Sequence, residues 1–198
     1  LMLFPYRLGK SASKCPPPAE LAALFERQRT SIAIGICSYK VHQASQSLLY
    51  FDSDRLFLSK KSTVYQVGEG VNGCPLNAEM CPSDPDFVAF VANRNVYIDC
   101  VGKIIYHTMG GKDIMCGSSS YIMQEELNRF TGLWWSPGNE KCLLYERVDE
   151  SNVSEAQFSC PGHHPLIPMR YPFAGTANAN STLRLITISS VKVNYEIT

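Results

Sequence analysis

Short apolar runs separated by polar turn residues fill most of the chain and predict short strands. The runs are rich in β-branched and aromatic residues, the types that favour strands over helices. From the N-terminal side, the expected strands cover residues 31–39, 47–51, 55–59 and 63–67. The sequence therefore predicts an all-β fold.

The clearest unit is the stretch from Asp86 to Thr108, which predicts three consecutive strands. Turn residues at 93–95 and around Gly102 separate these strands. Such a meander is close to one complete blade of a β-propeller. By spacing, the chain holds about two to three blade equivalents. Since no blade buries both of its faces alone, the blades should pack face to face. We thus expect a partial β-propeller.

Two segments depart from the strand pattern. After Pro16, Pro17 and Pro18, residues 19–29 are rich in strong helix formers and predict one short helix. Residues 109–120 are rich in Gly and Ser and predict a mobile loop. The expected organisation is an extended segment at 1–18, a short helix at 19–30, and a propeller portion at 31–198.

Charge and composition narrow the possible partners. Eighteen basic and 18 acidic residues cancel, so no charge excess favours nucleic acid or an anionic membrane. The longest apolar runs are far shorter than the ~20 residues that a membrane-spanning helix needs. No signal-peptide pattern opens the chain. It begins with Leu1, which suggests a piece of something longer.

The cysteines do not form a recognisable site. There are eight, without the pair spacing of a zinc site, and we expect neither a metal nor another cofactor. Several lie within apolar strands, which favours reduced thiols and a cytoplasmic location. The triplets at Asn152 and Asn180 match the glycosylation pattern and would matter only in a secreted protein.

The candidate chemistry lies between Gln124 and Trp135, where Glu125 and Glu126 precede a pair of tryptophans. Adjacent acids alone usually mark a solvated face. A glycosidase would need its carboxylates about 5 Å or more apart across a bond, whereas neighbours on a helix point about 100° apart. No further oxygen or imidazole ligands for a metal are evident nearby. Binding of an ammonium group fits best, because two carboxylates can accept charge-assisted hydrogen bonds from it.

The run from Gln124 to Pro137, QEELNRFTGLWWSP, resembles the signature of the dipeptidyl peptidase IV family of serine peptidases. In that family a double-Glu motif on a short helix precedes an aromatic stretch that ends in Trp-Trp-Ser-Pro. Residues 26–43, 81–98, 145–151 and 170–180 are similar to other segments of the family, in the same order. The likeness is greatest to the cytosolic members, and it extends from about residue 20 to about residue 190.

This resemblance implies roles for specific residues. Glu125 and Glu126 would hold the α-amino group of a peptide substrate and leave room for two residues before the scissile bond, with Pro or Ala second. An arginine at the end of the preceding helix would contact a substrate carbonyl. Arg29 matches this position, with Arg27 as the alternative, and a solvated helix end is the simpler interpretation of both. Family members have an eight-bladed propeller, and we expect a homodimer of the full-length protein.

The chain lacks the elements that would cut a peptide. The family uses Ser, Asp and His on an α/β-hydrolase domain, with the Ser in a Gly-x-Ser-x-Gly turn. No such motif is present, and the nearest, at residues 117–121, lacks the second glycine. We therefore expect no catalytic residue here and no activity from these residues alone. The alternative is a non-catalytic propeller module that binds peptides or protein partners. Trp134 and Trp135 should pack between blades.

Overall fold

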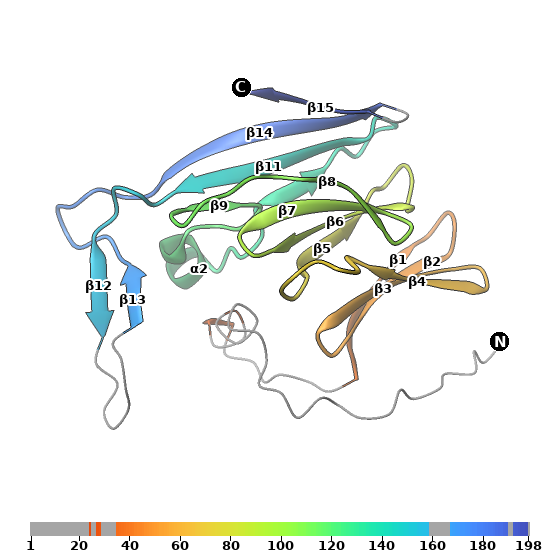
Figure 1. The fold of residues 1–198 in the computed structure, drawn as a ribbon, viewed down its shortest axis with the longest axis horizontal. Coiled ribbons are helices and arrows are strands. Elements are labelled where there is room, and N and C mark those ends of the chain that lie inside the picture. Colours follow the sequence, from red (N-terminus) through yellow and green to blue (C-terminus); the bar gives the residue numbers. More distant parts are fainter. Residues whose placement is uncertain (1–23, 25–26, 29–34, 159–166, 190–191, 198) are drawn as a thin grey trace.

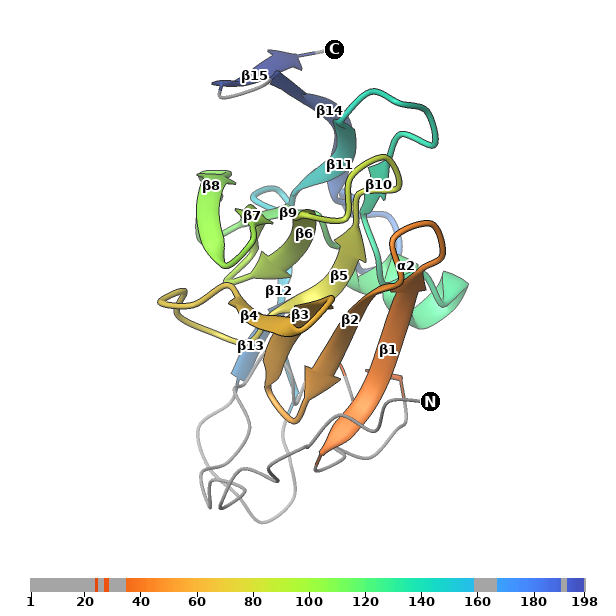
Figure 2. The same cartoon turned by 90° about the vertical axis from the view of Figure 1, so that its right-hand side faces the viewer.

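The computed structural model describes residues 24, 27–28, 35–158, 167–189 and 192–197. Within these residues it contains three antiparallel sheets, a separate hairpin and helix α2 (Figure 1). The sheets follow one another along the chain, and each begins with its earliest strand at one edge. Figure 2 shows the first strands of the three sheets on one side and the last strands on the other. This is the arrangement of consecutive propeller blades, so the all-β partial propeller predicted from the sequence is confirmed.

The first sheet is a four-stranded meander. It comprises β1 (Ile36–His42), β2 (Ser47–Asp52), β3 (Arg55–Lys60) and β4 (Thr63–Val67). The predicted strands at 47–51, 55–59 and 63–67 are confirmed to within one residue. Residues 31–34 of the first predicted strand lie outside the described residues.

The second sheet contains the meander that the sequence marked most clearly. Its strands are β5 (Leu76–Met80), β6 (Phe87–Ala92), β7 (Asn95–Cys100) and β8 (Lys103–His107). Neighbouring strands pair in order, and the turns fall where Asn93-Arg94 and Gly102 predicted them. Sequence analysis did not predict β5, which has no β-branched residue.

The third sheet has a long central pair and a divided edge. The pair is β11 (Cys142–Asp149) with β14 (Asn180–Ser189), and β15 (Lys192–Ile197) follows β14. On its other side β11 pairs with both β10 (Leu133–Trp135) and β9 (Ile114–Cys116). The prediction of a loop throughout 109–120 is wrong for residues 114–116, which form strand β9. This strand was missed because three residues with one β-branched side chain carry little signal, and only pairing with β11 makes them extended.

The remaining elements are short. Hairpin β12 (Glu155–Phe158) with β13 (Ile167–Arg170) projects away from the sheets in Figure 1. Helix α2 (Tyr121–Leu127) lies between β9 and β10 in the chain. Of the helix predicted at 19–29, only Leu24, Arg27 and Gln28 are described; the N–H of Gln28 donates to the carbonyl of Leu24 at 2.9 Å, as in a helical turn.

The core consists of two apolar layers, one on each face of the second sheet. Val88, Phe90 and Ala92 of β6 pack toward the first sheet, and Ala89 and Val91 pack toward the third. All five side chains are buried. Strand β6 therefore reads as a continuous apolar run because blades cover both of its faces.

One buried charge lies within this stack. Asp99 of β7 is fully buried and accepts the N–H of Gly68 at 3.1 Å and that of Gly102 at 2.7 Å. These bonds join the residue after β4 to the turn between β7 and β8. Burial raises the pKa of Asp99, and the two backbone donors only partly oppose that effect.

Candidate functional site

Helix α2 is carried by a loop inserted into the edge of the third sheet. Strands β9 and β10 run along the same side of β11, where Cys116 pairs with Arg147 and Leu133 with Tyr145. The residue between these partners on β11 is Glu146. Residues 117–132 thus form a loop between β9 and β10, and the two ends of this loop lie side by side next to Glu146 of β11.

The backbone closes the base of this loop. Gly117 donates its N–H to the carbonyl of Glu146 at 2.8 Å, and Glu146 donates its own N–H to the carbonyl of Gly132 at 2.7 Å. Gly132 in turn donates to the carbonyl of Gly117 at 3.0 Å. The two ends of the loop are therefore fixed to each other and to β11.

Both glycines are required by close packing. A Cβ on Gly117, whose φ is +77°, would lie 2.5 Å from a methyl of Val96 and 2.8 Å from one of Val91. A Cβ on Gly132 would lie 3.1 Å from the backbone of Gly117 and Ser118. Side chains at these positions would push the loop away from the core of the second sheet.

The helix itself is short and well capped. It has seven residues, fewer than an isolated helix needs in water. The Ser120 hydroxyl accepts the N–H of Met123 at 3.4 Å, and Asn128 ends the helix in the left-handed conformation with φ +51°. The N–H of Arg129 then returns to the carbonyl of Met123 at 3.1 Å. Capping sets where the helix begins and ends, but contacts with the sheet must hold it in place.

An ion pair holds the C-terminal end of α2 to the sheet. The guanidinium of Arg129 donates to both oxygens of the Glu146 carboxylate, at 2.6 and 3.1 Å. The Glu146 side chain is only 6% exposed. Such a two-point contact fixes orientation as well as distance.

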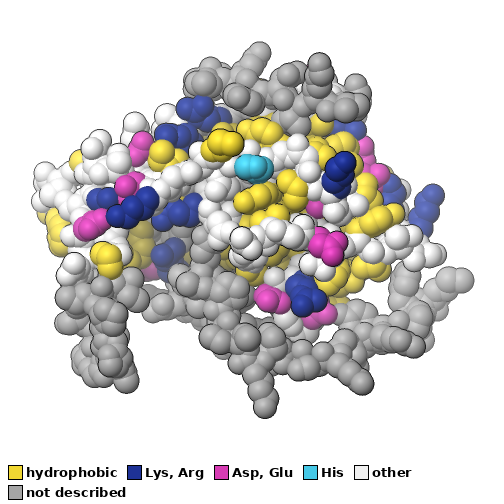
Figure 3. All heavy atoms as spheres, in the orientation of Figure 1, with side chains coloured by type: hydrophobic (Ala, Val, Ile, Leu, Met, Phe, Trp, Pro, Cys, Tyr) yellow, Lys and Arg dark blue, Asp and Glu magenta, His cyan; other side chains and the backbone are white. Residues whose placement is uncertain are grey.

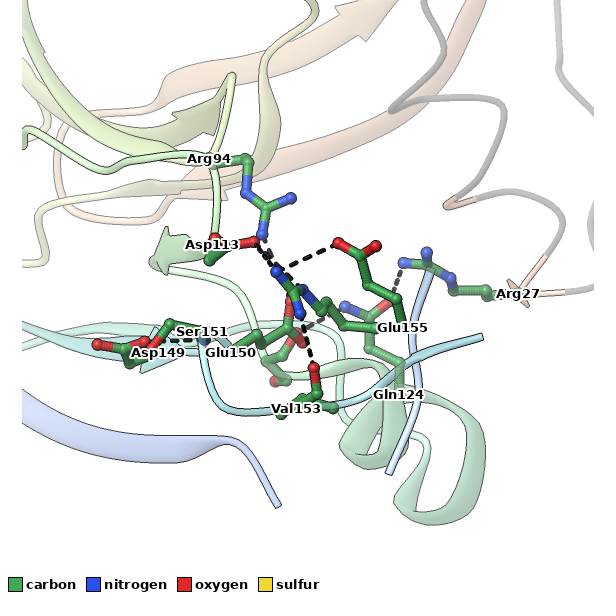
Figure 4. A network of polar contacts seen from close by, with 11 residues as sticks. Arg27, Arg94, Asp113, Gln124, Asp149, Glu150, Ser151, Val153 and Glu155 are labelled. Atoms are coloured by element: carbon green, nitrogen blue, oxygen red, sulfur yellow. Dashed lines mark hydrogen bonds and ion pairs between the residues drawn. The ribbon is translucent and has the colours of Figure 1, made fainter. Parts of the chain in front are cut away.

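A second buried carboxylate of the same strand region lies at the other end of the helix. Glu150 follows β11 directly and accepts the N–H of Tyr121, the first residue of α2. It also lies 3.4 Å from the guanidinium of Arg94 (Figure 4). Burial raises the pKa of Glu150, while the charge of Arg94 and the N–H of Tyr121 oppose that rise.

Arg27 reaches the same helix from the N-terminal segment. It donates to the side-chain oxygen of Gln124 at 2.8 Å, and its guanidinium lies 5.2 Å from the ring centroid of Tyr121. Gln124 is buried and donates its own amide to the carbonyl of Ser119 at 2.8 Å. Of the two arginines that the sequence offered, the structure thus places Arg27 beside the double-Glu helix. Arg29 lies outside the described residues.

The two candidate carboxylates, Glu125 and Glu126, are exposed on α2. Among the described residues, neither makes a hydrogen bond or an ion pair with another side chain. They differ in this from Glu146 and Glu150, which are buried and paired. Within the part of the chain that the structure describes, both carboxylates are thus open to solvent.

A hollow beside the helix is a separate feature. It has a volume of about 260 Å³ and lies beside the first turn of α2. Its lining includes Tyr121, Met123, Glu150 and Arg170, but not Glu125 or Glu126. Arg170 lies 2.9 Å from Asp113, and this ion pair joins strand β13 to the segment before β9.

The two tryptophans of β10 behave differently from each other. Trp135 packs against the core and donates its ring N–H to the carbonyl of Glu79 at 3.0 Å, which joins the third sheet to the second. Trp134 points to the other side of the strand and is 38% exposed. The predicted packing between blades is thus confirmed for Trp135, whereas Trp134 lies on the face of β10 that does not meet the second sheet.

On the face shown in Figure 3, basic side chains lie among acidic and apolar ones. Within the described ranges, no three His, Cys, Asp or Glu side chains come together as metal ligands. No helix in this part of the chain is both long and apolar enough to cross a membrane. Thiols that form no disulfide occur at Cys81, Cys100, Cys116 and Cys142.

Comparison with known proteins identifies the family of this chain. The family model for the dipeptidyl peptidase IV (DPP IV) N-terminal region matches residues 38–198. The chain belongs to this family. The DPP IV N-terminal match covers all three sheets and the loop that carries α2. Human dipeptidyl peptidase 8 is 27% identical over 203 residues, and its mouse counterpart is 26% identical. Each alignment covers 83% of this chain and 22% of the relative, so the chain spans about a fifth of the length of these relatives.

Sequence analysis missed the residues that hold helix α2 in place. It noted 145–151 as a segment similar to the family, but gave no role to Glu146, Glu150 or Arg129. The available signal was weak: two acids four positions apart, in and just after a strand that also carries Arg147 and Asp149, and an arginine just after the double-Glu pair. Only the pairing of β9 and β10 with β11 brings them together.

Proposed function

We propose that these residues form the substrate-recognising part of the propeller in a serine dipeptidyl peptidase. Glu125 and Glu126 bind the protonated α-amino group of a peptide, and Arg27 or Arg29 contacts a substrate carbonyl. The hydrolase domain of the same protein then releases an N-terminal dipeptide whose second residue is Pro or Ala. These residues themselves contain no catalytic group.

The observation that carries this proposal is the contrast among the acids around α2. Two glutamates that hold the helix are buried and paired, whereas Glu125 and Glu126 are exposed and make no ion pair with the described residues. A structural role would favour burial or pairing. An ammonium group brings three donors and a charge that both carboxylates can share.

The proposal also extends to partners and location. Peptides with an unblocked N-terminus are the ligands, the hydrolase domain is the partner within the chain, and the full-length protein forms a homodimer. The family resemblance supports a cytoplasmic enzyme, and neither a metal nor another cofactor is needed for the chemistry. Domain boundaries at 18 and 30 separate the extended segment and short helix from the propeller portion.

The test is a pair of variants in the full-length protein. Glu125→Gln and Glu126→Gln keep the size of the side chain and remove its charge. Each should lower kcat/KM for an H-Gly-Pro substrate about 10- to 100-fold, the value of one charge-assisted hydrogen bond. Glu140→Gln, an exposed acid in the turn between β10 and β11, serves as the matched control and should leave kcat/KM unchanged. Unchanged kinetics in both double-Glu variants would remove the site assignment.

A full-length protein without measurable peptidase activity would favour the alternative, a propeller module that binds peptides. Calorimetry with Gly-Pro-containing peptides then distinguishes the two roles of the carboxylates. Binding that is lost on N-acetylation of the peptide would keep Glu125 and Glu126 as an amine site without catalysis.

A further inference from the structure

Helix α2 cannot hold its own position. Seven residues are too few for a stable isolated helix, and Leu127 and both double-Glu residues face solvent. Gln124 is the only residue of the helix that is fully buried. The orientation of the carboxylates therefore depends on contacts made just outside the helix.

The strongest of these contacts is the pair between Arg129 and Glu146. Arg129 comes three residues after Glu126 and directly after the left-handed residue that ends the helix. Its two hydrogen bonds reach a carboxylate that is nearly buried at the base of the loop. The same guanidinium also donates to the carbonyl of Thr131 at 3.2 Å. One side chain thus links the end of α2, the returning strand and β11.

Glu146 is placed rigidly because its backbone is bound on both sides of the loop base. Its N–H and its carbonyl are each used by one of the two glycines there. The backbone that carries this carboxylate is therefore held in place. Arg129 binds the carboxylate and so links the end of helix α2 to β11. The pair at the other end, between Glu150 and Arg94, has a single longer contact of 3.4 Å.

From this geometry we propose that the Arg129–Glu146 pair is the positioning element for Glu125 and Glu126. The inference rests on the proposed function, and it assigns Arg129 and Glu146 to substrate recognition without any contact to substrate. Loss of the pair would let the carboxylates shift relative to the bound amine.

A positioning role makes a specific kinetic prediction. Binding of the amine stabilises the ground state and the transition state equally. Loss of this binding therefore raises KM more than it lowers kcat. In the full-length protein, Arg129→Met should raise KM for H-Gly-Pro-p-nitroanilide about 10-fold or more. Hydrolysis of the acetyl-Pro analogue, which lacks the amine, should be the same as in the unmodified protein.

The decisive experiment combines this variant with Glu125→Gln. If Arg129 acts through the carboxylates, Glu125→Gln should lower kcat/KM less than about 3-fold in the Arg129→Met background, compared with about 10-fold or more alone. Arg129→Lys keeps the charge but not the two-point contact, and should give an intermediate KM. It also keeps the test valid if Arg129→Met fails to fold.

Arg147→Met is the matched control. Arg147 lies on β11, its side chain is 27% exposed against 29% for Arg129, and its ion pair is with Asp149 at 3.7 Å. KM in this variant should stay within about 2-fold of the unmodified protein.

Two results separate failure of this inference from failure of the proposed function. A full effect of Glu125→Gln in both backgrounds, or equal losses on the amine and acetyl substrates, would overturn the positioning role alone. No effect of Glu125→Gln in the unmodified protein would overturn the proposed amine site, and the positioning role with it.

Discussion

Gly132 donates its backbone N–H to the carbonyl of Gly117 at 3.0 Å, across the base of the loop that carries helix α2. This bond makes the 16 residues from Gly117 to Gly132 a closed insertion into one edge strand. The blade keeps its pairing on both sides of the break, because β9 and β10 each bond to β11. A propeller blade can therefore carry a helix at its edge without disturbing the stacking of the sheets.

The closed loop predicts a high cost for a side chain at Gly117. Gly117→Ala would combine a positive φ with a methyl group 2.5 Å from Val96, so unfolding free energy should fall by about 2–4 kcal/mol. Urea unfolding of the purified chain measures this. Its two tryptophans, Trp134 and Trp135, follow the loop directly and report on it by fluorescence.

Gly111→Ala is the matched control for this change. Its added methyl would meet no atom within 4 Å, and its φ is not positive. The free energy of unfolding should change by no more than about 0.5 kcal/mol. Equal effects of the two substitutions would show that the loop base is not tightly packed.

Buried Asp99 predicts a second stability effect. Each of its oxygens accepts one backbone N–H, so Asp99→Ala would leave the N–H groups of Gly68 and Gly102 without an acceptor. An unsatisfied buried donor costs about 1–3 kcal/mol. Asp52→Ala, at a partly exposed side chain at the end of β2, should have a much smaller effect in the same unfolding measurement.

The pH dependence of this variant has a definite sign. Burial raises the pKa of Asp99 above its ordinary value of 3.8, so the folded state binds the proton more tightly than the unfolded state. The stability contributed by this proton is fully present below pH 3.8 and is lost as pH rises through the folded pKa. The advantage of the unmodified chain over Asp99→Ala should therefore shrink as pH rises from below 3.8. An advantage that grows over this range would show that the folded pKa is lowered.

The regular part of the fold could be predicted from the sequence because its strands are local. Strands β2–β4 and β6–β8 follow one another through tight turns, and the apolar runs and turn residues determine where each begins and ends. The double-Glu motif was identifiable for a similar reason, since all of its residues lie between Gln124 and Trp135.

The residues that hold helix α2 in place could not be predicted, because their contacts form only when strands that are far apart in the sequence pair. Arg129 meets Glu146 only when β10 and β9 lie on the same side of β11, and nothing in the three residues of β9 specifies that partner. Glu150 reaches the N–H of Tyr121 across 29 residues. The exposure of Trp134 follows from which face of β10 meets the second sheet, which a pair of adjacent tryptophans does not reveal.

Amine binding by Glu125 and Glu126 predicts that the pKa of the peptide amine sets the pH above which affinity falls. A peptide α-amine has a pKa near 7.7 to 8.0, and only its protonated form carries the charge that Glu125 and Glu126 can bind. The apparent affinity of the full-length protein for a peptide should fall above that range. Two peptides whose amine pKa values differ by about one unit should show midpoints that differ equally. An affinity that stays constant through pH 9 would count against the carboxylate pair.

The final prediction concerns which arginine serves the site. Arg27 contacts Gln124, the residue before the double-Glu pair, and lies over the ring of Tyr121, so its guanidinium is held at the helix that bears both carboxylates. Arg27→Met should therefore raise KM for an H-Gly-Pro substrate in the full-length protein about 10-fold, the value of one charged hydrogen bond. Arg27→Lys should recover little, because the planar fork bonds to Gln124 and stacks on Tyr121 in a way that an ammonium group does not. Arg29→Met, two positions along the same segment, is the comparison; a larger KM effect there than at Arg27 would reassign the contact to Arg29, and the contact between Arg27 and Gln124 would then serve only to hold the helix.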